Sequence, residues 1–246
     1  MRNRLEAPGD AVQGLMNDLK ILAAAHIKIR ASSHDIKTGL EEISIASVLS
    51  GPKLFGIKFE AMSGWPVVLT KEIDDLPSPE DRLRGRINLP NILASLPANA
   101  KNWAVDDIVY GVEYMKALPF FGRLSTIDQW RLASSSSVGI AHMQSAYYSY
   151  AMKASHTVYP DGRQVFNRFN HNSKLYSRLH IDLIRKFAEI RLEENEFLIL
   201  NKLLACTSSC NVSLESQHII DEERANAVRS LSYVVMTTHG SVKVSA

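Results

Sequence analysis

Two groups of side chains in this sequence have the residue types for catalysis, and their spacing argues against it. Ser134–Ser137 is a run of four serines. It lies in a segment whose pattern predicts helix, outside any Gly-x-Ser-x-Gly turn that would expose a nucleophile. Asp106 and Asp107 are adjacent, and adjacent helical residues point about 100° apart, so we interpret both as the acidic start of a helix. No Gly-rich phosphate loop is present, and we predict no catalytic residue, no cofactor and no enzyme.

Residues that bind metals are sparse. Cys206 and Cys210 are the only two cysteines, and although a helix could bring them to one side, two further ligands at suitable spacing are missing. We expect buried free thiols and no metal site. His142 lies on an apolar face, where a histidine is more often a core side chain than a ligand. Asn211-Val212-Ser213 matches a glycosylation sequon, but Ser213 is better interpreted as the N-cap of the helix that follows.

The composition favours one intracellular globular domain. The chain has 246 residues, of which 46% are hydrophobic, and a formal net charge of +2. This is enough apolar material for a substantial core. Because no basic run could follow a phosphate backbone, we expect no direct nucleic-acid contact. Since the sequence has no long apolar stretch and no signal-peptide pattern, we also expect no membrane association.

The segment from Val105 to Leu132 predicts two helices joined by a tight turn. Pro119 has no backbone N–H and disfavours helix at the preceding residue, so the first helix must end near it. Ser125 is followed three positions later by Asp128, a pattern typical of a helix start, where the hydroxyl caps an N–H and the carboxylate lies at the positive end of the dipole. The first helix carries an apolar stripe at helical spacing: Val105, Ile108, Val109, Val112 and Met115.

Other patterns predict more helices and one hairpin. Residues 50–100 contain six of the nine prolines, so we expect a long connector with short helical turns there. Asp161-Gly162 suits a tight turn between two short strands, residues 157–159 and 164–166. The remaining helices are predicted at residues 14–32, 138–152, 175–190, 193–204 and 214–237.

The helix join resembles the signature of nuclear hormone receptor ligand-binding domains, particularly those of the nematode supplementary type. The resemblance is carried by Lys116, Pro119, Phe121, Leu124, Asp128, Gln129 and Leu132. A second segment, Glu194–Lys202, is similar to the eighth helix of the family. The resemblance implies an all-α fold, a three-layer antiparallel helical sandwich with one small β-hairpin. We expect an N-terminal helix and irregular connector in residues 1–100, the ligand-binding core in residues 101–240 and a tail in residues 241–246.

The resemblance further implies a cavity for a small apolar ligand beneath the central helix. Ten positions would line this cavity: Trp103, Ala104, Asp107, Ile108, Gly111, Val138, Ala141, His142, Ser145 and Tyr148. The same residues are also consistent with an ordinary filled core. Tyr148 stands where relatives that hold fatty acids or steroids commonly carry an arginine, which argues against carboxylate capture by a bidentate guanidinium. A neutral or weakly polar ligand, or none, is therefore preferred.

A second implied site is a coregulator groove, in which a short amphipathic helix of a partner lies between the third and fourth helices of the fold. Its wall would comprise Val112, Lys116, Gln129, Trp130 and Ala133. Lys116 would cap the C-terminal carbonyls of the partner helix, which form the negative end of its dipole. The sequence shows neither the terminal dimerisation and activation helices of the family nor its zinc-module DNA-binding domain.

Together these features predict the ligand-binding domain of a nuclear receptor-like transcription regulator. It would act in the nucleus, or alternatively the cytoplasm, and bind a small apolar ligand and a coregulator peptide or another nuclear receptor. The alternative is a ligand-free structural interaction or decoy protein for full-length receptors. A helical lipid carrier or enzyme would fit the apolar helices but not the spacing from Pro119 to Gln129.

Overall fold

The structure, a computed structural model, describes residues 8–32, 44–57, 101, 103–160, 174–207 and 211–240. Its α-helices are α1 (Pro8–Arg30), α2 (Ile45–Ser50), α5 (Trp103–Ala117), α6 (Thr126–Ala151), α7 (Lys174–His180), α8 (Asp182–Ile190), α9 (Glu194–Ala205) and α10 (Leu214–His239). Two short 3-10 helices are η1 (Leu54–Gly56) and η2 (Phe121–Arg123). The all-α fold predicted from the sequence is thus confirmed. Residues 157–159, the first strand of the expected hairpin, form no strand beyond an isolated bridge at Val158. The second strand and most of the expected connector lie outside the described residues.

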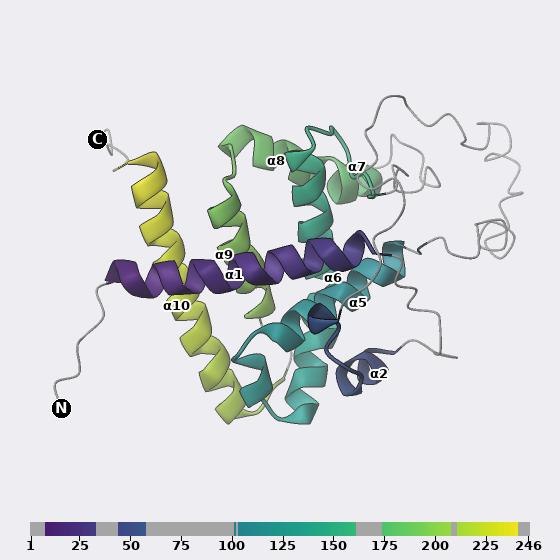
Figure 1. Cartoon of the computed structure of the whole chain (residues 1–246), viewed down its shortest axis with the longest axis vertical. Coiled ribbons are helices and arrows are strands. Elements are labelled where there is room, and N and C mark those ends of the chain that lie inside the picture. The colour runs from purple at the N-terminus through teal and green to yellow at the C-terminus, as the bar shows by residue number, and fades with distance from the viewer. Residues whose placement is uncertain are drawn as a thin grey trace, which may run out of the picture.

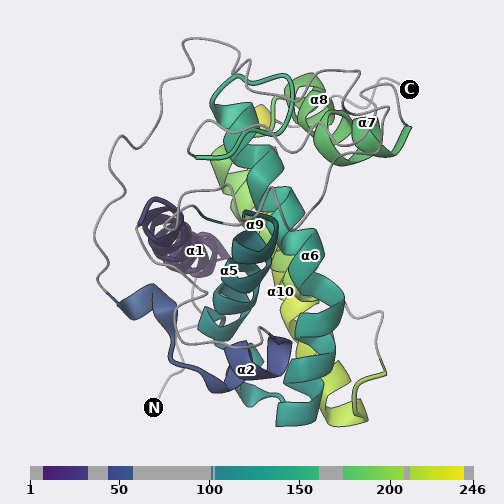
Figure 2. The ribbon, with the colours of Figure 1, turned by 90° about the vertical axis from the view of Figure 1, so that its right-hand side faces the viewer.

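The helices pack on one another in succession. Figure 1 shows α1 lying across the domain, where it contacts α5 and α9. Behind α1, helix α5 packs on α6, α6 packs on α9, and α9 packs on α10. Figure 2 shows the same arrangement from the side, with α5 between α1 and the long α6. The short α2 lies against α5 and α6 near their joined ends.

The predicted join between two helices is confirmed in detail. Helix α5 ends at Ala117, two residues before Pro119. The chain then makes the η2 turn, and α6 begins at Thr126 with Ser125 as its N-cap, whose side chain accepts a hydrogen bond from the Asp128 N–H. The carboxylate of Asp128 also accepts bonds from Ser213 N and Oγ and from Ser216 Oγ, at 3.2, 2.7 and 2.8 Å. Asp128 therefore ties the start of α6 to the start of α10.

Burial explains why charged residues in α5 need partners. Residues 109–116 of this helix are all buried, because α5 is covered by α1, α2 and α6. The aromatic side chains Tyr110 and Tyr114 are almost fully enclosed. On the other side of α6, Tyr147 stacks on Phe197 of α9 with ring centroids 3.7 Å apart. A charge on α5 cannot be hydrated there and must be neutralised by side chains or backbone.

Two helix boundaries differ from the sequence-based prediction. The segment expected as one helix over residues 175–190 is two helices, α7 and α8, separated at Ile181. At this break, the carbonyl of His180 accepts the Thr157 N–H at 2.9 Å. Conversely, the apolar segment 138–152 is part of the single 26-residue helix α6. The long α1 begins at Pro8, earlier than expected.

Gly111 marks the closest approach of α5 and α6. A Cβ at this position would lie 2.9 Å from the backbone oxygen of Ser137. We expect Gly111→Ala to lower the free energy of unfolding by about 2 kcal/mol, because two packed backbones must separate. Gly139→Ala is the matched control, since an added Cβ in α6 meets no atom within 4 Å, and it should stabilise by up to about 1 kcal/mol through helix propensity. Urea denaturation of both variants measures the difference, and equal effects would contradict it.

Candidate functional site

The five positions of the expected groove wall lie at the adjoining ends of α5 and α6. Val112 and Ala133 are buried, whereas Trp130 is 48% exposed. Gln129 is half-buried, and its Nε2 donates to the carbonyl of Leu124 at 3.0 Å. Gln129 therefore holds the turn before α6, while Trp130 presents an aromatic surface to solvent.

Lys116 is not a free surface charge. Its side chain is buried, and its Nζ donates to the carbonyl oxygens of Val48, Gly51 and Pro52 at 2.8, 3.2 and 2.9 Å. These carbonyls belong to the last turn of α2 and the residues just after it. Lys116 thus caps the C-terminal end of α2, a helix of the same chain, whereas the family resemblance implied that it would cap a partner's helix.

Glu113 is a further member of this site that the sequence analysis missed. Its Oε1 accepts from Lys116 Nζ at 2.7 Å, and its Oε2 accepts the Leu54 N–H at 2.8 Å. Burial raises the pKa of Glu113 above its ordinary value, and the bond from Lys116 opposes that rise. Glu113 lies three residues before Lys116, on the same face of the helix, and this spacing could have predicted an ion pair between them.

The interior beneath α6 contains a buried ion pair. Arg30 of α1 donates from Nε to Asp107 Oδ1 at 2.7 Å and from a terminal guanidinium nitrogen to Oδ2 at 2.9 Å. Ser145 Oγ donates to the same carboxylate at 2.7 Å. Of the two residues expected at a helix start, Asp106 lies in the first turn of α5, whereas Asp107 lies just beyond that turn and binds Arg30 of α1.

Aromatic rings enclose this ion pair. The guanidinium carbon of Arg30 lies 5.4 Å from the ring centre of Trp103 and 5.1 Å from that of Tyr148, distances that suit cation–π attraction. The hydroxyl of Tyr148 lies 2.9 Å from His26 Nδ1. Burial, together with the charges of Arg30 and Lys101, lowers the pKa of His26 well below its ordinary value. An arginine thus lies beside Tyr148, but it is Arg30 of α1, and its guanidinium is already bound by the carboxylate of Asp107.

The other expected cavity positions lie in several environments. Gly111 and Ala141 are buried between α5 and α6, and Ile108 borders a hollow of about 210 Å³ beside α2. His142 is half-buried, with its ring centre 6.4 Å from that of His180. Val138 is 58% exposed. The side chain of Ala104 is outside the described part of the chain. The nine described positions are therefore distributed over the ion pair, the contact between α5 and α6, the hollow beside α2 and the surface.

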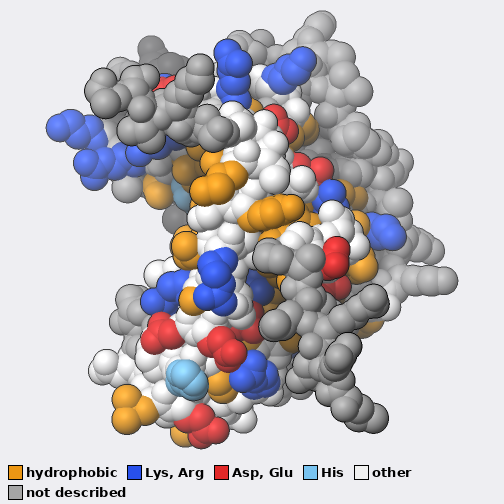
Figure 3. All heavy atoms as spheres, turned by 90° about the vertical axis from the view of Figure 1, so that its left-hand side faces the viewer, with side chains coloured by type: hydrophobic (Ala, Val, Ile, Leu, Met, Phe, Trp, Pro, Cys, Tyr) orange, Lys and Arg blue, Asp and Glu red, His pale blue; other side chains and the backbone are white. Residues whose placement is uncertain are grey.

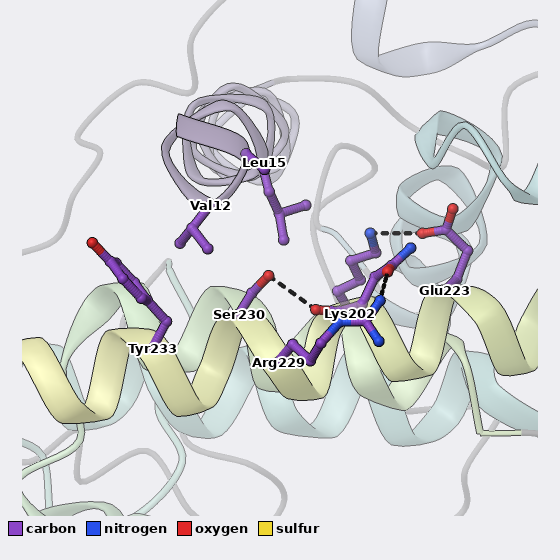
Figure 4. Close-up of a pocket in the computed structure, with 9 residues that line it drawn as sticks. Val12, Leu15, Lys202, Glu223, Arg229, Ser230 and Tyr233 are labelled. Atoms are coloured by element: carbon purple, nitrogen blue, oxygen red, sulfur yellow. Dashed lines mark hydrogen bonds and ion pairs between the residues drawn. The ribbon is translucent and has the colours of Figure 1, made fainter. Parts of the chain in front are cut away.

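A separate hollow, which the sequence did not predict, lies between α1, α9 and α10. It has a volume of about 520 Å³, and Figure 4 shows Val12 and Leu15 of α1 facing Ser230 and Tyr233 of α10 across it. At one end, Lys202 pairs with Glu223 at 2.9 Å. The residues that line it are Ala11, Val12, Leu15, Lys202, Glu223, Asn226, Arg229, Ser230 and Tyr233.

The outer face that carries α10 mixes apolar and charged side chains. Figure 3 shows hydrophobic side chains around the middle of this face, basic side chains above them, and mixed acidic and basic side chains below. Helix α10 exposes Val228, Tyr233 and Met236, at 49%, 42% and 66%. Apolar area of this kind is common on protein surfaces and is not by itself a site.

Three further features of the described residues concern metal ligands, thiols and helix length. In the described ranges, no three His, Cys, Asp or Glu side chains come together as metal ligands. Cys206 is a buried free thiol, as expected, and burial raises its pKa to about 12. Cys210 lies outside the described residues. Among the helices described, none combines the length and apolar character required to cross a bilayer.

Comparison with known proteins places the chain in a family. Residues 97–243, more than half of the chain, match the family described as ligand-binding domain of nuclear hormone receptor. Over 145 residues the chain is 26% identical to nuclear hormone receptor family member nhr-167 of Caenorhabditis elegans, covering 56% of this chain and 42% of that protein. Over 151 residues it is 26% identical to the androgen receptors of Eulemur fulvus collaris and Mus musculus, covering 60% of this chain and 17% of theirs.

The chain therefore spans less than half the length of these relatives. The family is non-enzymatic, which confirms the sequence-based prediction on that point. The match also covers the helix join from Lys116 to Leu132 that carried the resemblance. With its helical fold and the match over residues 97–243, this chain belongs to the family of nuclear hormone receptor ligand-binding domains.

Proposed function

We propose that the chain is the regulatory domain of a nuclear transcription regulator and that its working surface is the coregulator groove. This groove lies between α5 and α6 and has Val112, Lys116, Gln129, Trp130 and Ala133 as its wall. It binds a short amphipathic helix with leucines at positions i, i+3 and i+4, supplied by a coregulator or another receptor. The observation that carries the proposal is the capping of a short helix by Lys116 at this place.

The chemistry of the site suits such a helix. An ammonium group at the end of a groove is attracted to the unpaired carbonyls at a helix C-terminus. The apolar residues Val105, Ile108, Val109 and Val112 border one side of this region. Trp130 adds a large, partly exposed aromatic ring at the start of α6. A partner would therefore be held by apolar contacts along one face and by Lys116 at its end.

A small ligand in the interior is not needed for this function. Asp107, Ser145 and Tyr148 were expected to face a ligand, but each of them bonds to side chains of this chain. That pattern favours the ligand-free alternative, in which the interior is a structural core and regulation operates through protein partners. Contact with DNA would then be made by another segment or another protein.

Peptide binding tests the proposal. A dye-labelled peptide with a Leu-x-x-Leu-Leu core is titrated against the purified chain and followed by fluorescence anisotropy. We expect saturable binding that Trp130→Arg weakens at least about tenfold, since the charge is placed on an apolar contact surface. Met236→Arg is the matched control, because it introduces the same charge on the exposed face of α10. Equal binding by the Trp130→Arg variant and the unsubstituted chain would exclude this groove.

A further inference from the structure

The short helix α2 has the sequence pattern of a groove-binding helix. Its apolar residues are Ile45, Val48 and Leu49, at positions i, i+3 and i+4. All three belong to the core or pack against it, whereas Ala46 and Ser50 are exposed. Six residues are too few for a helix to be stable alone in water. Docking on α5 and α6 must therefore supply most of its stability, as it does for a partner helix that folds on binding.

The backbone groups at both ends of α2 form hydrogen bonds in the docked position. At the N-terminus, Ser44 and Ser47 form a reciprocal capping box, with bonds of 3.0 and 3.1 Å between each backbone N–H and the other hydroxyl. At the C-terminus, Lys116 binds three carbonyls and Glu113 accepts the Leu54 N–H. The two charged groups of the groove are therefore both committed to residues 48–54.

The apolar contact under α2 is less complete. A hollow of about 210 Å³ is lined by Ser44, Ile45 and Val48 on the α2 side and by Val105, Ile108, Val109 and Val112 on the α5 side. Side chains that leave space beside them forgo dispersion contacts and apolar burial. A leucine in place of Val48 would extend one carbon further into this space. Residues of α2 thus occupy the groove with less contact than a leucine-rich helix could make.

We propose that residues 44–54 are a built-in occupant of the coregulator groove, and that a partner helix binds only when this segment leaves. The inference rests on the proposed function of the groove. Figures 1 and 2 both show α2 beside α5 and α6, at the place where the partner helix would lie. Because the occupant is tethered, it competes at the high effective concentration of an intramolecular ligand. Coregulator binding is therefore reduced until release of α2 exposes Lys116 and Glu113.

The test compares three forms of the full chain with two labelled peptides, one with a Leu-x-x-Leu-Leu core and one comprising residues 43–54. Val48→Asp places a charge on the buried face of α2, and Ala46→Asp places the same charge on its exposed face. We expect Val48→Asp to bind both peptides at least about tenfold more tightly than the unsubstituted chain, and Ala46→Asp to leave binding unchanged. Unlabelled 43–54 peptide should displace the leucine-rich peptide from Val48→Asp.

The outcomes separate this inference from the function on which it rests. Equal binding of the leucine-rich peptide by the unsubstituted chain and Val48→Asp would overturn the inference and leave the groove function intact. Absence of leucine-rich peptide binding to any form would overturn the function, and the inference with it. If circular dichroism shows that Val48→Asp does not fold, the Ile45→Ala/Leu49→Ala variant replaces it, because it weakens the same face of α2 without adding a charge. Its binding of the leucine-rich peptide is then compared with that of the unsubstituted chain in the same way.

Discussion

Asp107→Ala is expected to lower the free energy of unfolding by about 3 to 5 kcal/mol, the largest effect of any single substitution considered. The carboxylate is the bidentate partner of Arg30, and both side chains are buried, at 8% and 4% exposure. Removing it leaves a guanidinium without a counter-charge in an apolar setting, which costs far more than the pair itself contributes. Chemical denaturation of the purified variant provides the measurement.

Two comparisons control this result. Arg30→Met/Asp107→Ala removes both charges and should be less destabilised than Asp107→Ala alone, since no buried charge remains. Glu189→Ala removes one partner of the surface pair with Arg185, where both side chains are 63% exposed, and should cost less than about 1 kcal/mol. If Asp107→Ala lowers the free energy of unfolding no more than Glu189→Ala does, the prediction is wrong, and Arg30 must reach solvent when its partner is removed.

Asp128→Ala is expected to lower the free energy of unfolding by about 3 kcal/mol. The side chain accepts hydrogen bonds from Ser125, Ser213 and Ser216, and bonds to a charged acceptor contribute more than neutral ones. Bonds from Ser213, Ser216 and Ser125 hold the pKa of Asp128 well below its usual range, although burial opposes that shift. Its contribution is therefore complete above the unfolded-state pKa and is lost as the pH falls through the folded-state value.

The matched control is Asp221→Ala, an acidic residue of α10 that pairs with Arg224 while half exposed. We expect a change of less than about 1 kcal/mol there. The acid sensitivity supplies a second readout: below about pH 4 the unsubstituted chain should lose stability faster than Asp128→Ala, because only the former has this carboxylate to protonate. Parallel pH profiles would show that Asp128 is replaceable at the junction of α6 and α10.

Local chemistry made the helix join predictable. Pro119 must end a helix near itself, Ser125 and Ser213 are good N-caps, and each acts within a few residues of its own position. The apolar stripe from Val105 to Met115 likewise carries its period in the sequence. The expected break near Pro119, the start at Ser125 and the cap at Ser213 all agree with the structure. The family followed from the same residues, because the join is its signature.

Contacts between distant segments were not predictable in this way. The partner of Asp107 is Arg30, 77 residues away, and no pattern near either residue indicates the other. At the end of α7, the carbonyl of His180 accepts the Thr157 N–H, a contact that no pattern near either residue indicates. For Lys116, the family resemblance implied a cap on a partner's helix, whereas in the structure its ammonium group binds carbonyls at the end of α2.

The sequence by itself determined where the helices of the join begin and end, and it determined the family, since capping, proline geometry and apolar period act over a few residues. Only the tertiary structure determined which groups bind the buried charged side chains. Residues 109–116 are enclosed on every side, so Glu113 and Lys116 must be satisfied by whichever segment docks there. That segment is α2 and the residues after it, because their free carbonyls and the Leu54 N–H match both charges at once.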